Sequence, residues 1–279
     1  MRPPAAARMR RMIRNVHDAA LAALMIDDPV AKCAAAAALR HDWIARTLDV
    51  LEGGDDARAI AEPGRPSRPQ LVAPQALSSR HIGSREGHAA LLHAIAHIEF
   101  NAINLALDCV HRFRSMPAAF HRDWIHVAAE EASHFELVQA RLHALGHGYG
   151  DFSAHNGLWD MACRTADDVL SRMALVPRVL EARGLDATPM IVAKLRRIGD
   201  DESVAVLDVI LRDEVGHVAI GDYWFRDCCA RRGLDAEAVY LELMERFNAP
   251  WPQAPLHREA RLAAGFSAAE LDRLARGRR

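Results

Sequence analysis

The chain has 279 residues and a mass of 30.8 kDa, and its 51% hydrophobic and 26% charged residues are enough for one sizeable core. The formal net charge of −2 argues against a nucleic-acid partner, because such proteins usually carry a strong basic excess. No apolar stretch approaches the roughly eighteen residues that a membrane span needs, so we expect no membrane partner.

The cysteines and the N-terminal segment bear on the cellular compartment. The five cysteines are an odd number and form no C-x-x-C pair, which argues against a disulfide framework or a thiolate zinc site. Residues 1–15 are basic but lack the apolar region of a secretory signal. We therefore expect a cytoplasmic protein.

The N-terminal part of the chain predicts a helical extension over residues 1–60. Two helices are expected there, at Arg10–Met25 and Val30–Leu51, because alanine and leucine dominate and Asp27-Asp28-Pro29 separates the two segments. Residues 61–85 are rich in proline and arginine, which predicts an irregular connecting arm.

The remaining chain favours an all-α fold with a four-helix bundle over residues 86–231. Amphipathic periodicity predicts long helices at 86–114, 119–144, 165–184 and 200–230, and Thr188-Pro189 predicts the start of a short helix at 189–198. The second and third long helices are joined by the glycine-rich segment 146–160, which is long enough to cross the length of a bundle. Residues 232–279 form a C-terminal extension, in which Ser267 and Glu270 fit a capping box at the start of a short helix.

Two Glu-x-x-His motifs carry the chemistry of this bundle. Glu131 and His134 share one face of the second long helix, and Glu214 and His217 share one face of the fourth, about one turn apart. Either motif alone is a weak signal. Both, however, lie inside the apolar stripe that faces the core, where an unpaired glutamate is costly.

The other two long helices each place one glutamate in the same way. Glu99 precedes Glu131 by 32 residues, and Glu181 precedes Glu214 by 33 residues. The chain thus contains two similar hairpins, each with a glutamate on its first helix and Glu-x-x-His on its second. Paired antiparallel, they bring four carboxylates and two imidazoles together.

Charge balance predicts two divalent metal ions at this point. Four buried carboxylates could not all ionise together without cations, and two divalent ions neutralise them. Carboxylate and imidazole ligands suit iron or manganese, and zinc also accepts them. The acidic residue before each motif, Glu130 or Asp213, points toward a neighbouring helix, where it can accept the N–H of the opposite metal-bound imidazole.

This set of residues resembles the ferritin-like diiron-carboxylate superfamily. Segments such as LLHAIAHIEFNAINLALD, EEASHFELV and ILRDEVGHVAIGDYW are similar to those of a bacterial ferritin-like family whose function is unassigned. The resemblance implies that Glu99, Glu131, His134, Glu181, Glu214 and His217 bind two metal ions, usually iron, that react with dioxygen or peroxide. Position 130 departs from the pattern, because Glu130 replaces the aspartate often seen there.

The expected function is therefore that of a dinuclear non-haem metal oxidoreductase, most simply diiron, acting on a small-molecule or macromolecular substrate with an electron donor. The superfamily includes oxygenases, desaturases, a tRNA hydroxylase, manganese catalases and ferroxidases, so the substrate stays open. A ferroxidase or metal-handling protein, a manganese catalase and a non-enzymatic module with a structural metal are the alternatives. The sequence leaves the oligomeric state open.

Several features have plainer interpretations. For the six predicted ligands, the alternative to metal binding is a set of structural salt bridges within the helical bundle. His93 and His97 are expected at the surface or in support of the ligands, since His97 lies roughly 200° around the helix from Glu99. Pro177 predicts a kink in the third long helix, either shaping the metal pocket or simply fitting its neighbours.

Overall fold

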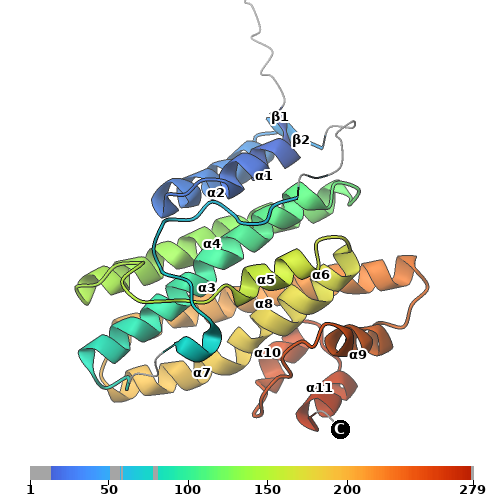
Figure 1. Cartoon of the computed structure of the whole chain (residues 1–279). Coiled ribbons are helices and arrows are strands. Elements are labelled where there is room, and N and C mark those ends of the chain that lie inside the picture. Colours follow the sequence, from blue (N-terminus) through green and yellow to red (C-terminus); the bar gives the residue numbers. More distant parts are fainter. Residues whose placement is uncertain (1–13, 51–56, 58, 78–80, 278–279) are drawn as a thin grey trace, which may run out of the picture.

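The computed structural model describes residues 14–50, 57, 59–77 and 81–277, and it confirms an all-α helical bundle (Figure 1). The helices pack as an N-terminal pair, a central group and a C-terminal group. Their bounds are α1 Val16–Leu24, α2 Pro29–Ile44, α3 Arg85–Arg112, α4 Ala118–Ala144, α5 Gly157–Arg164, α6 Val169–Leu175, α7 Ala182–Arg197, α8 Asp201–Arg231, α9 Ala236–Arg246, α10 Arg258–Ala263 and α11 Ala268–Ala275.

The central group consists of two helical hairpins. Helix α3 packs along α4, while α6 and α7 pack along α8, and α4 contacts α8 between the hairpins. Each long helix begins at a polar cap where the sequence offers one: Ser84 accepts a hydrogen bond from the N–H of Gly87, and Asp200 accepts one from the N–H of Ser203. The sequence placed α3, α4 and α8 correctly to within a few residues.

The third long helix differs from the prediction of helices at 165–184 and 189–198. Residues 165–168 form a turn, and Asp168 caps α6. The helical path then runs through the π-helical segment Val176–Glu181 directly into α7, with Pro189 inside that helix. Packing overrides the local start signal, because Leu185, Val192 and Leu195 of α7 are buried.

The π-helical segment gives a physical reason for the predicted kink at Pro177. Proline has no N–H to donate to the preceding turn, so the regular hydrogen-bond pattern is broken there. The irregular turn that results ends at Glu181. Gly221 of α8 accommodates it, because a side chain at position 221 would overlap the ring of Pro177.

The segment 146–160 also differs from the prediction of a simple crossover. Its last residues already belong to α5, and its middle contacts the proline-rich arm: Leu71 bridges Ala154, and the N–H of Val72 donates to the carbonyl of Ala154 at 2.8 Å. The only regular element in the described arm residues 61–77 is the short 3-10 turn Pro74–Ala76.

The N-terminal pair covers the first hairpin, with α1 packed on α3 and α2 packed on α4 (Figure 1). The expected start at Arg10 lies outside the described residues. The expected extension of the second helix to Leu51 is wrong, because α2 ends at Ile44 and Arg46 adopts a left-handed φ of 54°. The strand β2, Leu48–Asp49, then pairs in parallel with β1, Arg14–Asn15.

The C-terminal group packs against the second hairpin. The capping box predicted for Ser267 and Glu270 is present at the start of α11. Glu270 also accepts a hydrogen bond from the guanidinium of Arg178 at 2.5 Å, which joins α11 to the π-helical segment.

One correction concerns membrane spans. Within the described residues, α3 is long and apolar enough to cross a membrane, by length and composition alone. However, most of its apolar stretch is buried inside the protein, as in a core helix.

Candidate metal centre

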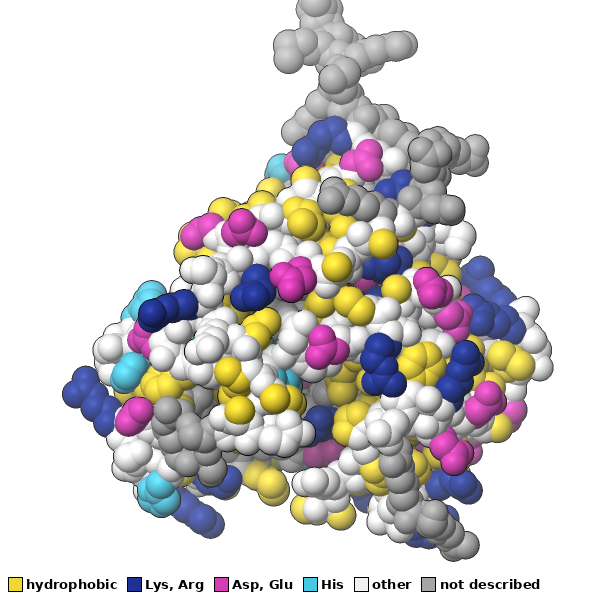
Figure 2. All heavy atoms as spheres, viewed as in Figure 1, with side chains coloured by type: hydrophobic (Ala, Val, Ile, Leu, Met, Phe, Trp, Pro, Cys, Tyr) yellow, Lys and Arg dark blue, Asp and Glu magenta, His cyan; other side chains and the backbone are white. Residues whose placement is uncertain are grey.

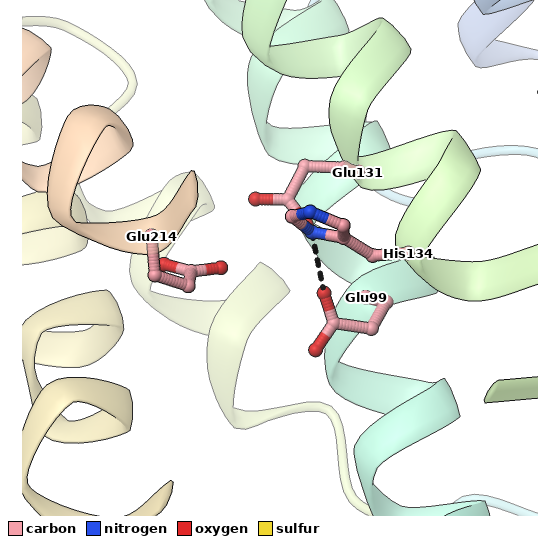
Figure 3. Close-up of side chains that lie close together, drawn as sticks. All are labelled: Glu99, Glu131, His134 and Glu214. Carbon is pink, nitrogen blue, oxygen red and sulfur yellow. Dashed lines mark ion pairs between the residues drawn. The ribbon is translucent and has the colours of Figure 1, made fainter. Parts of the chain in front are cut away.

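The two hairpins bring the predicted ligands together. Ligand atoms of Glu99 on α3, Glu131 and His134 on α4, and Glu214 on α8 all lie within 4.8 Å of one another. Figure 3 shows these four side chains pointing toward a common space between the helices. The structure therefore contains a buried carboxylate–imidazole group of a kind that can hold a metal ion.

Glu131 lies between the two histidines. Its Oε1 is 2.9 Å from Nδ1 of His217, and its Oε2 is 3.4 Å from Nδ1 of His134. The residue is fully buried, with 0% of its surface exposed. Glu131 therefore joins the two histidines into one buried carboxylate–imidazole group.

The remaining predicted ligands approach from both hairpins. Glu99 Oε2 lies 3.4 Å from His134 Nδ1, and Glu214 Oε1 lies 3.7 Å from His217 Nδ1. Glu181 ends the π-helical segment and lines the same cavity as Glu99 and Glu214. The tight four-residue group does not include Glu181 or His217, but both adjoin it. His217 contacts Glu131 and Glu214, and the field of Glu214 acts on Glu181.

Each of the six predicted ligands has a buried polar atom that makes no well-aligned hydrogen bond among the described residues: Glu99 Oε2, both Oε atoms of Glu131, His134 Nδ1, Glu181 Oε2, Glu214 Oε2 and His217 Nδ1. Five of these seven atoms face one another in the carboxylate–imidazole pairs given above. Glu181 Oε2 and Glu214 Oε2 have neither a hydrogen bond nor an ion pair among the described residues, although buried polar groups are almost always satisfied. The donor set thus fits metal ions, which would satisfy these atoms together.

The far side of each imidazole is held by an acid from the opposite helix, as the sequence predicts. Nε2 of His134 on α4 lies 3.2 Å from Asp213 Oδ2 on α8, and Nε2 of His217 on α8 lies 3.0 Å from Glu130 Oε2 on α4. When Nε2–H donates to the carboxylate, the lone pair of Nδ1 faces the cluster. The glutamate at position 130 therefore reaches its histidine despite its departure from aspartate.

The pKa values of Glu130 and Asp213, the two acids that contact the far side of the imidazoles, both favour the ionised carboxylate. The hydrogen bond from His217 lowers the pKa of Glu130. Burial raises the pKa of Asp213, but hydrogen bonds from Arg212 and His134 outweigh burial and lower it overall. These anions are therefore good acceptors for the imidazole N–H groups.

The pKa values of the predicted ligands show that it is unfavourable to ionise several buried carboxylates close together. Burial, followed by the fields of neighbouring carboxylates, raises the pKa of Glu181 and Glu214, and burial is also the main cause of the raised pKa of Glu99. Burial opposes the charge of Glu131, but the field of His217 and the hydrogen bonds from both histidines outweigh burial and lower its pKa. Burial likewise opposes the charge of His134, but Glu131 and Glu99 raise its pKa to about 11. Protons and metal ions therefore compete for this cluster.

His93 and His97 are not at the surface. Their residues are 1% and 9% exposed, and His97 Nδ1 lies 2.9 Å from the hydroxyl of Tyr149, while His93 Nε2 accepts the N–H of Gly150 at 2.9 Å. They fasten the segment after α4 to α3. The sequence carries no signal for this contact, because the partners lie more than fifty residues away.

The fold and this cluster define a class: an all-α protein with a buried carboxylate–imidazole site able to hold a metal ion. The chain belongs to the family described as "Protein of unknown function (DUF455)", whose model matches residues 25–272. It is 50% identical over 214 residues, 74% of each chain, to an uncharacterized protein of Haemophilus influenzae. No solved structure matches. The expected membership of a family without an assigned function is thereby confirmed.

Proposed function

We propose that this protein is a dinuclear metal oxidoreductase of the ferritin-like diiron-carboxylate type. The observation that carries the proposal is the buried group of four glutamates around two histidines, in which Glu181 Oε2 and Glu214 Oε2 have neither a hydrogen bond nor an ion pair among the described residues. Structural salt bridges do not account for this group, because two imidazoles can balance at most two of its four carboxylates.

In this proposal the cluster divides into two metal positions. His134 and Glu99 would hold one ion, His217 and Glu214 would hold the other, and Glu131 would contribute to both. Glu181 completes the set from the π-helical segment. Two ferrous ions at these positions would supply electrons for the reduction of dioxygen or peroxide.

The protein's own residues have three tasks. Glu130 and Asp213 orient the imidazoles and keep Nδ1 directed at the metals. The four glutamate carboxylates would neutralise the charge of two divalent cations. The buried side chains of α3 and α4, among them Ile103, Phe100 and Phe135, exclude water from the first hairpin's side of the cluster.

Metal analysis tests the proposal directly. Protein produced with ample iron should contain two metal ions per chain, and Glu131→Ala should lose both because it removes the ligand that contributes to both. Glu136→Ala is the matched control, since Glu136 lies on the same helix but is exposed. Metal-free wild-type protein, or unchanged metal content in Glu131→Ala, would contradict the assignment.

Stopped-flow absorbance after mixing the reduced, iron-loaded protein with oxygen separates the alternatives. An oxidoreductase should oxidise its bound iron rapidly without turning over excess ferrous iron. Catalytic turnover of ferrous iron alone would indicate a ferroxidase, peroxide disproportionation by the manganese form would indicate a catalase, and a silent metal would indicate a structural role.

A further inference from the structure

A large cavity adjoins the metal cluster. Its volume is about 630 Å³, within the roughly 300–1,000 Å³ typical of small-molecule sites. Glu99, Glu181 and Glu214 contribute to its wall, so the candidate metal positions open directly into it. A molecule bound there would reach the metal centre without any rearrangement of the helices.

Most of the remaining wall is apolar. Buried side chains from three helices form its interior: Leu105 of α3, Met161 of α5, and Leu207 and Ile210 of α8. Ile98 and Met190 also belong to the lining but are 51% and 53% exposed, which marks the rim of an opening. Figure 2 shows the surface hollowed in the region between α5 and α10, with hydrophobic side chains beside charged ones.

The lining includes two guanidinium groups in different situations. Arg164 donates to the carbonyl of Phe247 and lies 5.5 Å over the ring of that residue, so its position is already fixed by the protein. Arg183 is exposed and makes no hydrogen bond or ion pair with any residue that the structure describes. It lies two positions after Glu181 on the helical path, on the exposed side of the cavity wall.

Resting on the dinuclear function proposed above, we propose that this cavity binds a small apolar carboxylate, with its anionic end at Arg183 and its apolar end beside Glu99, Glu181 and Glu214. The opposite orientation would place the anion beside Glu99, Glu181 and Glu214, whose charges the proposed metal ions already balance, and the hydrocarbon chain at an exposed guanidinium. The proposed orientation instead pairs the carboxylate with that guanidinium at the rim and keeps the hydrocarbon chain in the apolar interior. The substrate class is thus an amphipathic organic acid whose hydrocarbon end faces the metals.

Calorimetric titration of the metal-loaded protein with decanoate and with decan-1-ol tests the binding mode. Both should bind, because they share the hydrocarbon chain. Arg183→Gln should weaken the binding of decanoate about tenfold and leave the binding of decan-1-ol unchanged. Ile98→Trp should weaken the binding of both by narrowing the opening of the cavity. Arg197→Gln is the matched control, because Arg197 is an exposed arginine of the same helix outside the cavity lining.

Proton relaxation in the Mn²⁺-loaded protein tests the orientation. The terminal methyl of decanoate should relax faster than the protons beside its carboxylate, because the methyl lies closer to the metal. The reverse order, absence of decanoate binding, or equal binding by Arg183→Gln would overturn the inference. Metal content measured on the same samples keeps the outcomes distinct, since full metal loading without decanoate binding contradicts only this inference.

Discussion

The two hairpins supply equivalent ligands from unlike surroundings. In the first, α3 and α4 are regular helices, and Glu99 and Glu131 are 4% and 0% exposed. In the second, the first helix is interrupted by the π-helical segment, and the side chain of Glu214 is 12% exposed toward the cavity that Glu181 also lines. Helix α4 of the first hairpin, none of whose residues line the cavity, thus forms the closed wall of the cluster, whereas α3 and the second hairpin form its open wall.

The hairpins are also anchored differently. The first is covered by the N-terminal helices, where the neutral histidines His17 and His121 meet edge to face at 4.7 Å. The second is joined to the C-terminal helices by a buried ionic network around Arg178. The open wall is thus joined to its neighbouring helices by a buried ionic network, whereas His17 and His121 form an uncharged contact at the closed wall. The following predictions test that contrast.

The largest expected effect concerns Arg178 in the π-helical segment. Its side chain is fully buried, pairs with Asp222 at 2.8 Å and Glu270 at 2.5 Å, and stacks on Tyr240 at 4.2 Å. Arg178→Met should lower the free energy of unfolding by about 3–5 kcal/mol, because it leaves the two buried acids with only the partly exposed Arg226 as a cation. Urea denaturation measures this loss.

A surface pair on α8 gives the control for Arg178. Arg231 and Asp227 form an ion pair whose arginine is 57% exposed, so Arg231→Met should cost at most about 1 kcal/mol. A loss of similar size in both variants would mean that the buried network adds nothing beyond an exposed pair.

The next effect concerns the contact between α8 and the π-helical segment. Gly221→Ala should displace Pro177 and lower the free energy of unfolding by about 1–3 kcal/mol through overpacking. Because the segment ends at Glu181, metal content should also fall. Gly216→Ala on the same helix meets no atom within 4 Å and should be neutral or stabilise by up to about 1 kcal/mol. Normal metal content in Gly221→Ala would show that Glu181 does not depend on this contact.

Three long helices and most of the candidate metal ligands could be predicted from the sequence. The helices α3, α4 and α8 follow from their 3.6-residue periodicity, and the convergence of Glu99, Glu131, His134, Glu214 and His217 follows from their positions on the apolar faces. The cross-helix pairing of Glu130 and Asp213 follows from a rotation of about 100° per residue.

The remaining features depend on contacts between distant segments. The proline signal at Pro177 indicates a kink, but the π-helical geometry depends on the space left by Gly221, more than forty residues later. Helix α9 was not predicted separately within the C-terminal extension, and the cavity is formed by side chains from α3, α5, α7 and α8 together. No local pattern encodes such a surface.

A smaller effect should distinguish the two metal positions through their outer acids. Asp213→Asn should weaken metal binding beside His134, and Glu130→Gln beside His217, by about 10–100-fold each, because the carboxylate acceptor of the imidazole N–H is lost. Competition with a chelator of known affinity measures both. The exposed Glu136→Gln on α4 is the control. If each variant weakened the binding of both ions equally, the assignment of one histidine to each ion would be wrong.

The smallest effect is a pH dependence at the closed wall. His121 is fully buried, its Nε2–H donates to the carbonyl of Met116 at 3.1 Å, and burial together with neighbouring His17 lowers its pKa to about 4. Since the unfolded imidazole has a pKa near 6.5, the unfolded state binds the proton first as the pH falls. His121 alone should therefore cost about 1 kcal/mol of stability between pH 6 and 5.

His17 of α1 should add to this pH dependence of stability, in the same direction as His121. Burial lowers the pKa of His17, and the ring lies 2.7 Å from the carbonyl of Val110. The charged or titratable groups whose fields act on His17 are Arg114, His111, Asp18 and His121. Urea denaturation at pH 6 and pH 5 should show a reduced pH dependence in His121→Gln and an unchanged one in His143→Gln, whose histidine is exposed on the same helix. An unchanged dependence in His121→Gln would mean that the closed wall is held by groups other than this neutral pair.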